Sequence, residues 1–297
     1  MIKSNRKAGT LFPFSLRFLH GDTPGDGSSR WILNLLAIGL VLAYSLPYIY
    51  LISTSLKPGA EVLQIPPSFL PSSISLGSYA SLLENQAIPT AFANSIIVAV
   101  SATLLSLLLA VPAAYGASFF RTRMSIYFMM FALITRMVPS VSLGVPLFTV
   151  LKSMSLLDTR LGLVLAHTTI ALPLAIWLMS AFFESIPRDL EEAARIDGCT
   201  RFQAFTKIVM PLAATGMAIS ALFCFIASWN EFLFALLLTS DSAKTAPIVI
   251  AEYKTAYGLD WGPMTALATV YSLPVIVITL MLQKQIIGGL TFGAVKG

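Results

Sequence analysis

One polar stretch, SIPRDLEEAARIDGCTRFQAFTKIVMP from Ser185 to Pro211, interrupts an otherwise apolar sequence. Together with Glu184 it carries five acidic and four basic residues, whereas long runs almost free of charge flank it on both sides. Charged side chains are costly inside a bilayer, so this stretch must lie in water. The flanking runs exceed the ~20 apolar residues that a membrane-spanning helix needs. The stretch therefore predicts spanning helices joined here by one long aqueous loop.

The residues of this loop predict two short helices with a turn between them. Pro187 suits a first helical turn, and Gly198 suits the left-handed residue that ends a helix. Thr200 and Gln203 have the spacing of a capping box for the second helix, which Pro211 closes. The first helix has acids near its positive end: Asp189, Glu191 and Glu192. The second helix has one apolar face: Phe202, Phe205, Ile208 and Val209. The loop is either a linker packed on its own span ends or a docking element for a partner.

The composition of the whole chain agrees with a membrane protein. Of 297 residues, 56% are hydrophobic and 11% charged, against about 25% charged in soluble domains. This excludes a typical soluble enzyme, a disordered chain and a nucleic-acid-binding domain. Two cysteines and two histidines exclude a disulfide framework or a His/Cys metal cluster.

The intervals between charged residues predict an all-α integral membrane protein with six transmembrane helices. They lie near 31–54, 92–116, 125–147, 162–183, 212–238 and 264–284. An even number places both termini on one side. Thirteen of the 19 basic residues then lie on the side of the 185–211 loop, which the positive-inside rule makes cytoplasmic. The net charge of +5 is thus explained by topology, without nucleic acid.

Three further regions complete the organisation. Residues 1–30 are polar and predict a flexible cytoplasmic extension. The first apolar run is too long for a signal peptide, whose apolar core has about 7–15 residues. The proline-rich segment 57–91 predicts a loop or short interfacial structure outside.

The 185–211 loop also resembles a known motif. Glu192-Ala193-Ala194, Gly198 and the run from Ile208 to Pro211 are similar to the EAA motif, E-A-A-x3-G-x9-I-x-L-P, with Met210 in place of its leucine. This motif is typical of permease subunits of binding-protein-dependent ABC importers. The likeness to MalG-like carbohydrate permeases extends from about Trp31 to the C-terminus through further short matches: Asn94-Ser95, Asp158-Thr159, Ile176-Trp177, Ile196-Asp197, Trp229-Asn230-Glu231-Phe232 and Gly293-Ala294-Val295-Lys296-Gly297.

The resemblance implies the type I importer fold in a permease domain over 31–297, with a core near 90–284. It implies a second related permease subunit, two ATPase subunits and an extracytoplasmic solute-binding protein as partners. The function implied is translocation of a sugar, polyol or glycoside across the bacterial inner membrane.

In such permeases the EAA loop is a coupling helix held by the ATPase. Glu192 would pair with a basic residue of the ATPase, with Glu191 and Asp197 as weaker candidates. Ala193 and Ala194 would allow a close fit, and Gly198 the turn. The tail 285–297 of such permeases also reaches the ATPase, which makes Lys296 a further implied contact. Phe202 is a candidate on the ground of its own chemistry, since it belongs to the apolar face of the loop.

The chain carries no G-x-x-x-x-G-K-[ST] phosphate loop, so it has no ATPase site of its own. We expect ATP and Mg²⁺ to bind the partner ATPases, and neither a catalytic nor a metal site here. ATPase closure would then move the coupling loop as a stiff lever and tilt the spans between two states.

Polar residues within spans are candidates for the solute path. Glu231 would line that path, pair with Arg136 or lie at a helix interface. Arg136 precedes Pro139, and Pro139 and Pro146 predict a broken helix near a cavity. His167 and Asn94 are candidates either for solute contact or for interhelical hydrogen bonds, and Asn230 adjoins Glu231.

Two other functions fit the composition. One is a proton-coupled secondary transporter that uses Glu231 as its proton site. The other is a membrane anchor or assembly factor without a conduit.

Overall fold

The computed structural model describes residues 27–120, 122–255 and 258–292 and is mainly helical. It forms two units, one ending at Ile49 and the other beginning at Tyr50. Helix α1 (Gly27–Ser55) begins a few residues before the predicted span 31–54. Its apolar side chains from Trp31 to Tyr50 are mostly exposed, as in a helix whose surface is covered by lipid or another protein. The predicted extension 1–30 lies almost wholly outside the described residues.

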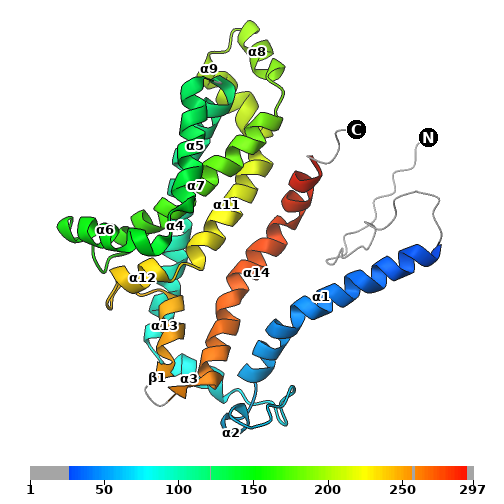
Figure 1. Ribbon diagram of the computed structural model, residues 1–297, viewed down its shortest axis with the longest axis vertical. Coiled ribbons are helices and arrows are strands. Elements are labelled where there is room, and N and C mark those ends of the chain that lie inside the picture. Colours follow the sequence, from blue (N-terminus) through cyan, green and yellow to red (C-terminus); the bar gives the residue numbers. More distant parts are fainter. Residues whose placement is uncertain (1–26, 121, 256–257, 293–297) are drawn as a thin grey trace, which may run out of the picture. The chain divides into compact units, whose positions relative to one another are not determined.

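The second unit is built on four long helices, α4 (Ala87–Phe120), α7 (Arg160–Ser185), α11 (Ala214–Trp229) and α14 (Trp261–Phe292) (Figure 1). Helices α4, α7 and α11 all pack against one another, and α14 packs against α11. Small residues at these contacts, among them Ala110, Ala171 and Ala175, have no exposed surface. Small side chains let helix backbones approach closely, which is how helices associate in membranes.

Within the described residues, four helices are long and apolar enough to span a membrane. They contain the predicted spans 31–54, 92–116, 162–183 and 264–284. Two bent helix pairs raise the number to six if each pair is one span. The predicted all-helical membrane fold is therefore confirmed, with four to six candidate spans.

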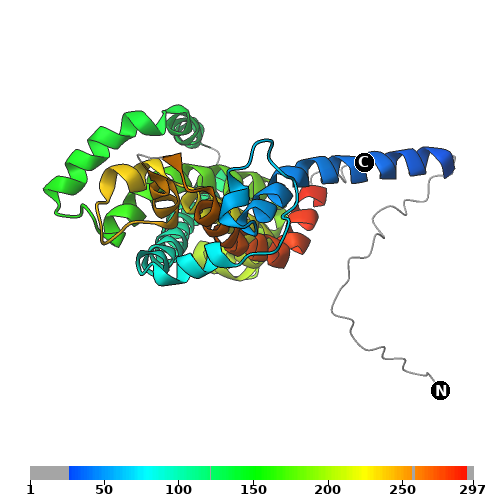
Figure 2. The same ribbon diagram turned by 90° about the horizontal axis from the view of Figure 1, so that it is seen from below.

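The third predicted span, 125–147, consists of two helices, α5 (Arg123–Met137) and α6 (Ser140–Ser153), that meet at 97°. Pro139 precedes α6 with extended backbone, so the predicted break occurs at this proline. Pro146 lies inside α6 without interrupting it. Figure 2 shows α6 at the outer edge of the second unit.

The fifth predicted span, 212–238, is not one helix. Helix α11 ends at Trp229, and a separate short helix, α12 (Leu233–Leu238), follows. The Glu231 carboxylate accepts the N–H groups of Phe234 and Ala235. It thus caps the free N–H groups at the start of α12. Residues 230–232, between α11 and α12, are not helical. At the other end, the axis of α11 bends by 71° from the preceding helical segment at Ala213.

The shorter elements lie in the connections. Helices α2 (Gly59–Val62) and α3 (Gly77–Glu84) give the predicted outer segment 57–91 its short structure. The 185–211 loop contains α8 (Asp189–Ile196), α9 (Arg201–Ala204), the π-helix η2 (Phe205–Val209) and the start of α10 (Met210–Leu212). After α12 come α13 (Ala246–Glu252) and the antiparallel strands β1 (Lys254–Thr255) and β2 (Gly258–Leu259).

Candidate functional sites

The 185–211 loop has the two helices and the turn that its sequence predicts. Gly198 has a φ of 92°, in the left-handed region that favours glycine. Gln203 N–H donates to the Thr200 hydroxyl at 3.2 Å, and Thr200 N–H donates to the Gln203 side chain at 2.9 Å, so both bonds of the capping box form. The predicted place of Pro187 in the first helical turn differs slightly, since α8 begins at Asp189 and Pro187 lies before it. The Pro187 carbonyl accepts the N–H of Leu190.

Helix α8 divides the predicted coupling residues between two faces. Glu191 and Ala194 are each only 8% exposed, and the Glu191 carboxylate lies close to Tyr115 of α4. The remaining predicted contacts of this motif are exposed to solvent: Glu192, Ala193, Asp197 and Gly198. A Cβ built on Gly198 would meet no atom within 4 Å, so the space beside the turn is open.

The predicted apolar face of the second helix is also divided. Val209 is completely buried, and the Phe205 ring lies 4.5 Å from the Tyr115 ring, centroid to centroid. Phe202 is instead 73% exposed, and Ile196 at the end of α8 is 86% exposed. The loop is thus fastened by its inner side chains and presents both carboxylates and large apolar side chains on its outer surface.

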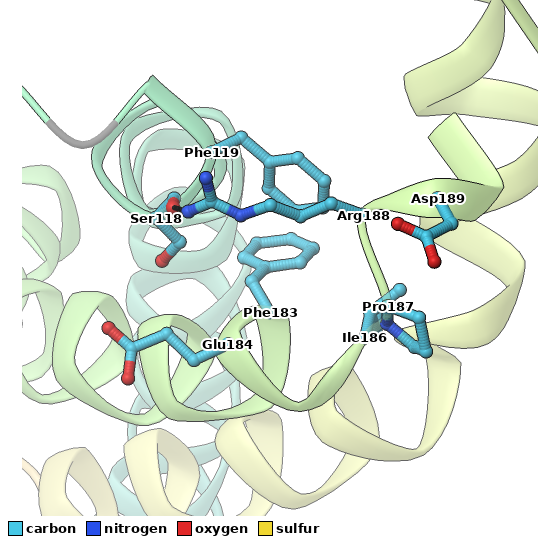
Figure 3. Close-up of a pocket in the computed structure, with 8 residues that line it drawn as sticks. All are labelled: Ser118, Phe119, Phe183, Glu184, Ile186, Pro187, Arg188 and Asp189. Carbon is cyan, nitrogen blue, oxygen red and sulfur yellow. Dashed lines mark hydrogen bonds between the residues drawn. The ribbon is translucent and has the colours of Figure 1, made fainter. Parts of the chain in front are cut away.

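A hollow of about 370 Å³ lies where the loop leaves α7. Figure 3 shows that the Arg188 side chain runs alongside the rings of Phe119 and Phe183 toward Ser118. The Arg188 guanidinium donates to the Ser118 carbonyl at 2.7 Å. Sequence reasoning missed this contact, because nothing in the pattern places Arg188 beside a helix end 70 residues earlier.

The last predicted coupling residue, Lys296, lies outside the described residues, as do the other residues after Phe292. The first part of the predicted tail, 285–292, continues helix α14.

Among the polar residues of the spans, His167 and Glu231 meet in the interior. His167 is 1% exposed, and its Nδ1 lies 2.8 Å from the Ser228 hydroxyl. Its Nε2 lies 3.5 Å from a Glu231 carboxylate oxygen, and the Glu231 side chain is 8% exposed. The group joins α7 to the break between α11 and α12, so the interface role predicted for Glu231 matches its position. Ser228, which completes the group, carried no signal in the sequence.

Arg136 does not pair with Glu231 in this structure. It is exposed, and its Nη1 donates to the Ile170 carbonyl at 3.3 Å. The pairing expected from two lone charges fails because His167 occupies the place beside Glu231 and backbone N–H groups take up the carboxylate. Asn230, at the end of α11, is exposed.

Asn94 lies in a buried polar contact between helices and a loop. It has no exposed surface, and its Nδ2 donates to the carbonyls of Ser242 and Lys244 at 3.0 and 2.8 Å. Its Oδ1 accepts a 2.7 Å bond from Arg160 Nε. Beside it, the Ser95 hydroxyl accepts the N–H of Ala246. Of the two roles predicted for Asn94, the structure thus displays the internal hydrogen-bonding one.

Asp158 fastens the same loop, the 239–246 segment, from the start of α7. Its carboxylate accepts four consecutive backbone N–H groups at 3.1–3.3 Å: those of Ser240, Asp241, Ser242 and Ala243. Partial burial opposes its ionisation, but these donors outweigh burial and hold the pKa of Asp158 well below its usual range. The sequence offered only a resemblance for Asp158, because its backbone donors carry no pattern.

In the part of the chain that the structure describes, no group of three or more His, Cys, Asp or Glu residues is placed to hold a metal ion. At one end of α7, Asp158, Asn94 and Ser95 form a clasp that holds the 239–246 segment by hydrogen bonds. At the other end, the 185–211 loop faces outward.

Comparisons with known proteins identify the family of this chain. Residues 102–287 match the family model described as binding-protein-dependent transport system inner membrane component. The trehalose transport system permease protein SugB of Mycobacterium tuberculosis is 39% identical over 269 residues, which cover 90% of this chain and 96% of that protein. The trehalose/maltose transport system permease protein MalG of Thermococcus litoralis is 35% identical over 272 residues, covering 90% and 97%.

A solved structure is similar as well. One chain of a bacterial ABC transporter involved in the import of the acidic polysaccharide alginate superimposes with a TM-score of 0.71 at 28% identity, covering 88% of this chain and 99% of that one. The family match covers more than half of the chain, and the relatives align over nearly their whole length. The chain therefore belongs to the family of binding-protein-dependent transport system inner membrane components and is a multi-pass permease of an ABC importer.

Proposed function

We propose that this chain is the translocation subunit through which an ABC importer brings a sugar, polyol or glycoside across the bacterial cytoplasmic membrane. A solute-binding protein outside delivers the solute, and a second, related permease subunit completes the conduit. Two partner ATPase subunits bind ATP and Mg²⁺ and supply the energy. The assignment to this family excludes the alternative of a proton-coupled secondary transporter.

The observation that carries the proposal is the outer surface of the 185–211 loop. Glu192 and Asp197 are exposed there beside Ile196 and Phe202, which are 86% and 73% exposed. This surface combines large apolar side chains with carboxylates on a loop whose helices are capped. It is suited to a protein partner with a basic rim and an apolar cleft. We assign this surface to the ATPase, with Glu192 as the main charged contact and Gly198 as the open turn.

The same loop helps to define the topology. If each bent helix pair is one span, the chain has six spans, and both termini lie on the side of the loop. The excess of basic residues on that side supports a cytoplasmic location. Lys296 would then also lie where it can meet the ATPase.

For the solute path we retain the polar residues that are exposed in this unit, Arg136 and Asn230. The hydrogen bonds of Asn94 and His167 within the chain favour a positioning role for both. Glu231 has the same character, because it caps α12 and faces His167.

The carbohydrate class is supported by what the similar proteins carry, trehalose in one and trehalose or maltose in another. Alginate, carried by the transporter of similar structure, is also a carbohydrate.

Reconstitution of the complete assembly in proteoliposomes tests the proposal. The ligand that copurifies with the binding protein is identified by mass spectrometry and then supplied in radiolabelled form. We expect a carbohydrate, taken up only with ATP on the ATPase side and still taken up after an ionophore collapses the proton gradient. Uptake that needs no ATPase, or a non-carbohydrate ligand, would contradict the proposal.

A further inference from the structure

Two arginines of the 185–211 loop lie against the same end of α4. Arg188, the residue before α8, donates from Nη2 to the Ser118 carbonyl at 2.7 Å, and its guanidinium lies 6.0 Å from the Phe119 ring. Arg201, the first residue of α9, lies 4.8 Å from the Phe120 ring. A guanidinium within about 6 Å of an aromatic ring is attracted to its face. The loop is therefore attached to α4 on both sides of α8, by the residue before it and by the first residue of α9.

The end of α4 suits these contacts. The last four carbonyls of a helix lack intrahelical partners and carry partial negative charge. Ser118 lies two residues before the last residue of α4, Phe120. Arg188 therefore satisfies a free carbonyl, and both arginines place positive charge where the helix dipole favours it.

Aromatic packing stiffens the same junction. The Tyr115 ring of α4 lies 4.7 Å from Phe119 and 4.5 Å from Phe205 of η2. Phe183, at the end of α7, lies 5.9 Å from Tyr115 and 6.4 Å from Phe119. Close packing of this kind transmits displacement, because a packed core does not deform continuously.

We infer that Arg188 and Arg201 are positioning residues that transmit movement of α8 to α4, a helix that the loop does not adjoin in sequence. This inference rests on the proposed function, in which the ATPase moves the loop. Helices α7 and α10 follow the loop because the backbone joins them to it. Helix α4 is not joined to the loop by the backbone: it packs on α7 and, through Tyr115, on η2, and Arg188 and Arg201 add contacts from the residues on either side of α8.

The route has a defined far end. Helix α4 has 34 residues and is therefore about 50 Å long. Near its other end it carries Asn94 and Ser95, which bind the 239–246 segment. A displacement of α8 thus reaches the opposite end of the unit along one helix.

The test measures solute imported per ATP hydrolysed by the full assembly in proteoliposomes. The double variant Arg188→Gln/Arg201→Gln removes both charges, and Lys207→Gln removes an exposed charge of the same loop as a matched control. We expect the double variant to retain its ATPase subunits and its ATP turnover, with the imported solute per ATP lowered about threefold. We expect Lys207→Gln to match the wild type and Arg188→Lys/Arg201→Lys to restore most of the ratio, since charge over the rings is kept.

A double-mutant cycle separates the contact from a general loss of structure. If Arg201 acts through Phe120, Arg201→Gln combined with Phe120→Leu will lower the ratio no further than either change alone. Additive effects, an unchanged ratio, or loss of the ATPase subunits from the arginine variants would overturn the inference. A wild-type assembly that imports without ATP would instead contradict the proposed function.

Discussion

The two ends of α7 contrast a connection completed within the chain with one that is left open. At the Arg160 end, Asp158, Asn94 and Ser95 take up the backbone of the 239–246 segment through hydrogen bonds. At the Ser185 end, the 185–211 loop is held by its capping box and its inner side chains, but its outer carboxylates and apolar side chains are exposed. The axis between them is about 39 Å long, for 26 residues.

The difference shows how a structural polar residue is distinguished from one that awaits a partner. Both regions contain acids that sequence reasoning singled out by resemblance. In the 239–246 clasp, the Asp158 carboxylate accepts backbone N–H groups of the same chain. Glu192 is instead exposed on the surface of the 185–211 loop. An acidic side chain that is exposed on a well-packed loop, rather than charge alone, indicates a role in binding a partner.

The largest effect that we expect comes from removing the charge of Glu192. In Glu192→Gln, the loss of a charged contact in an interface should lower ATP-driven uptake about tenfold or more, while the affinity of the binding protein for solute stays unchanged. The matched change Asp241→Asn removes an exposed charge from the completed region and should leave uptake within about twofold. Equal uptake by the two variants in proteoliposomes would end the contrast between the regions.

The second effect concerns stability. In Asp158→Asn, an amide replaces the carboxylate that accepts four N–H groups, and one of its atoms becomes a donor facing donors. Hydrogen bonds to charged groups contribute about 1.5–3 kcal/mol, so we expect about 2 kcal/mol lower stability. Thermal unfolding in detergent measures this loss, and limited proteolysis should show earlier cleavage near 239–246. An unchanged midpoint with an intact segment would mean that the clasp does not hold it.

A third, smaller effect is the pH dependence of the same clasp. Because the folded-state pKa of Asp158 is depressed, its stabilisation is present above the unfolded pKa near 3.9 and is lost as pH falls through the folded value. The difference in unfolding midpoint between the wild type and Asp158→Asn should therefore be constant from about pH 7 to 5 and shrink below about pH 4. A difference that grows in acid has the wrong sign for this account.

The smallest effect belongs to the turn of the open loop. Gly198 has a φ of 92° with free space around it, so in Gly198→Ala the strain is that of the backbone alone, about 1 kcal/mol. We expect a small loss of stability and a several-fold loss of uptake, since the turn orients α8 toward the ATPase. If stability falls but uptake does not, the turn is structural only.

Local features of this chain were predictable from sequence, because their causes lie within a few residues. The Thr200–Gln203 capping box, the left-handed Gly198 and the break at Pro139 all follow from short-range backbone chemistry. The long apolar helices follow from runs without charge. The prediction of one continuous helix over 212–238 was wrong between Trp229 and Leu233, because the capping of α12 by Glu231 competes with continuation of α11.

The partners of polar residues were not predictable. Asn94 and Lys244 are 150 residues apart, and the donors to Asp158 are backbone groups that any residue supplies. Glu231 lies beside His167 rather than Arg136 because of helix packing, which charge counting does not reveal. The motif placed Glu191 and Glu192 together, and only the fold shows that one faces inward and the other outward.

Photo-cross-linking in the complete assembly shows whether the outer surface of the 185–211 loop binds the ATPase. A photoreactive phenylalanine analogue is placed at Phe202, which is 73% exposed, or at Phe205, which packs on Tyr115, in the complete assembly. We expect the probe at 202 to cross-link to the ATPase subunit and the probe at 205 to react within the chain. Cross-linking of the 202 probe to lipid or to the solute-binding protein, with none to the ATPase, would contradict the account.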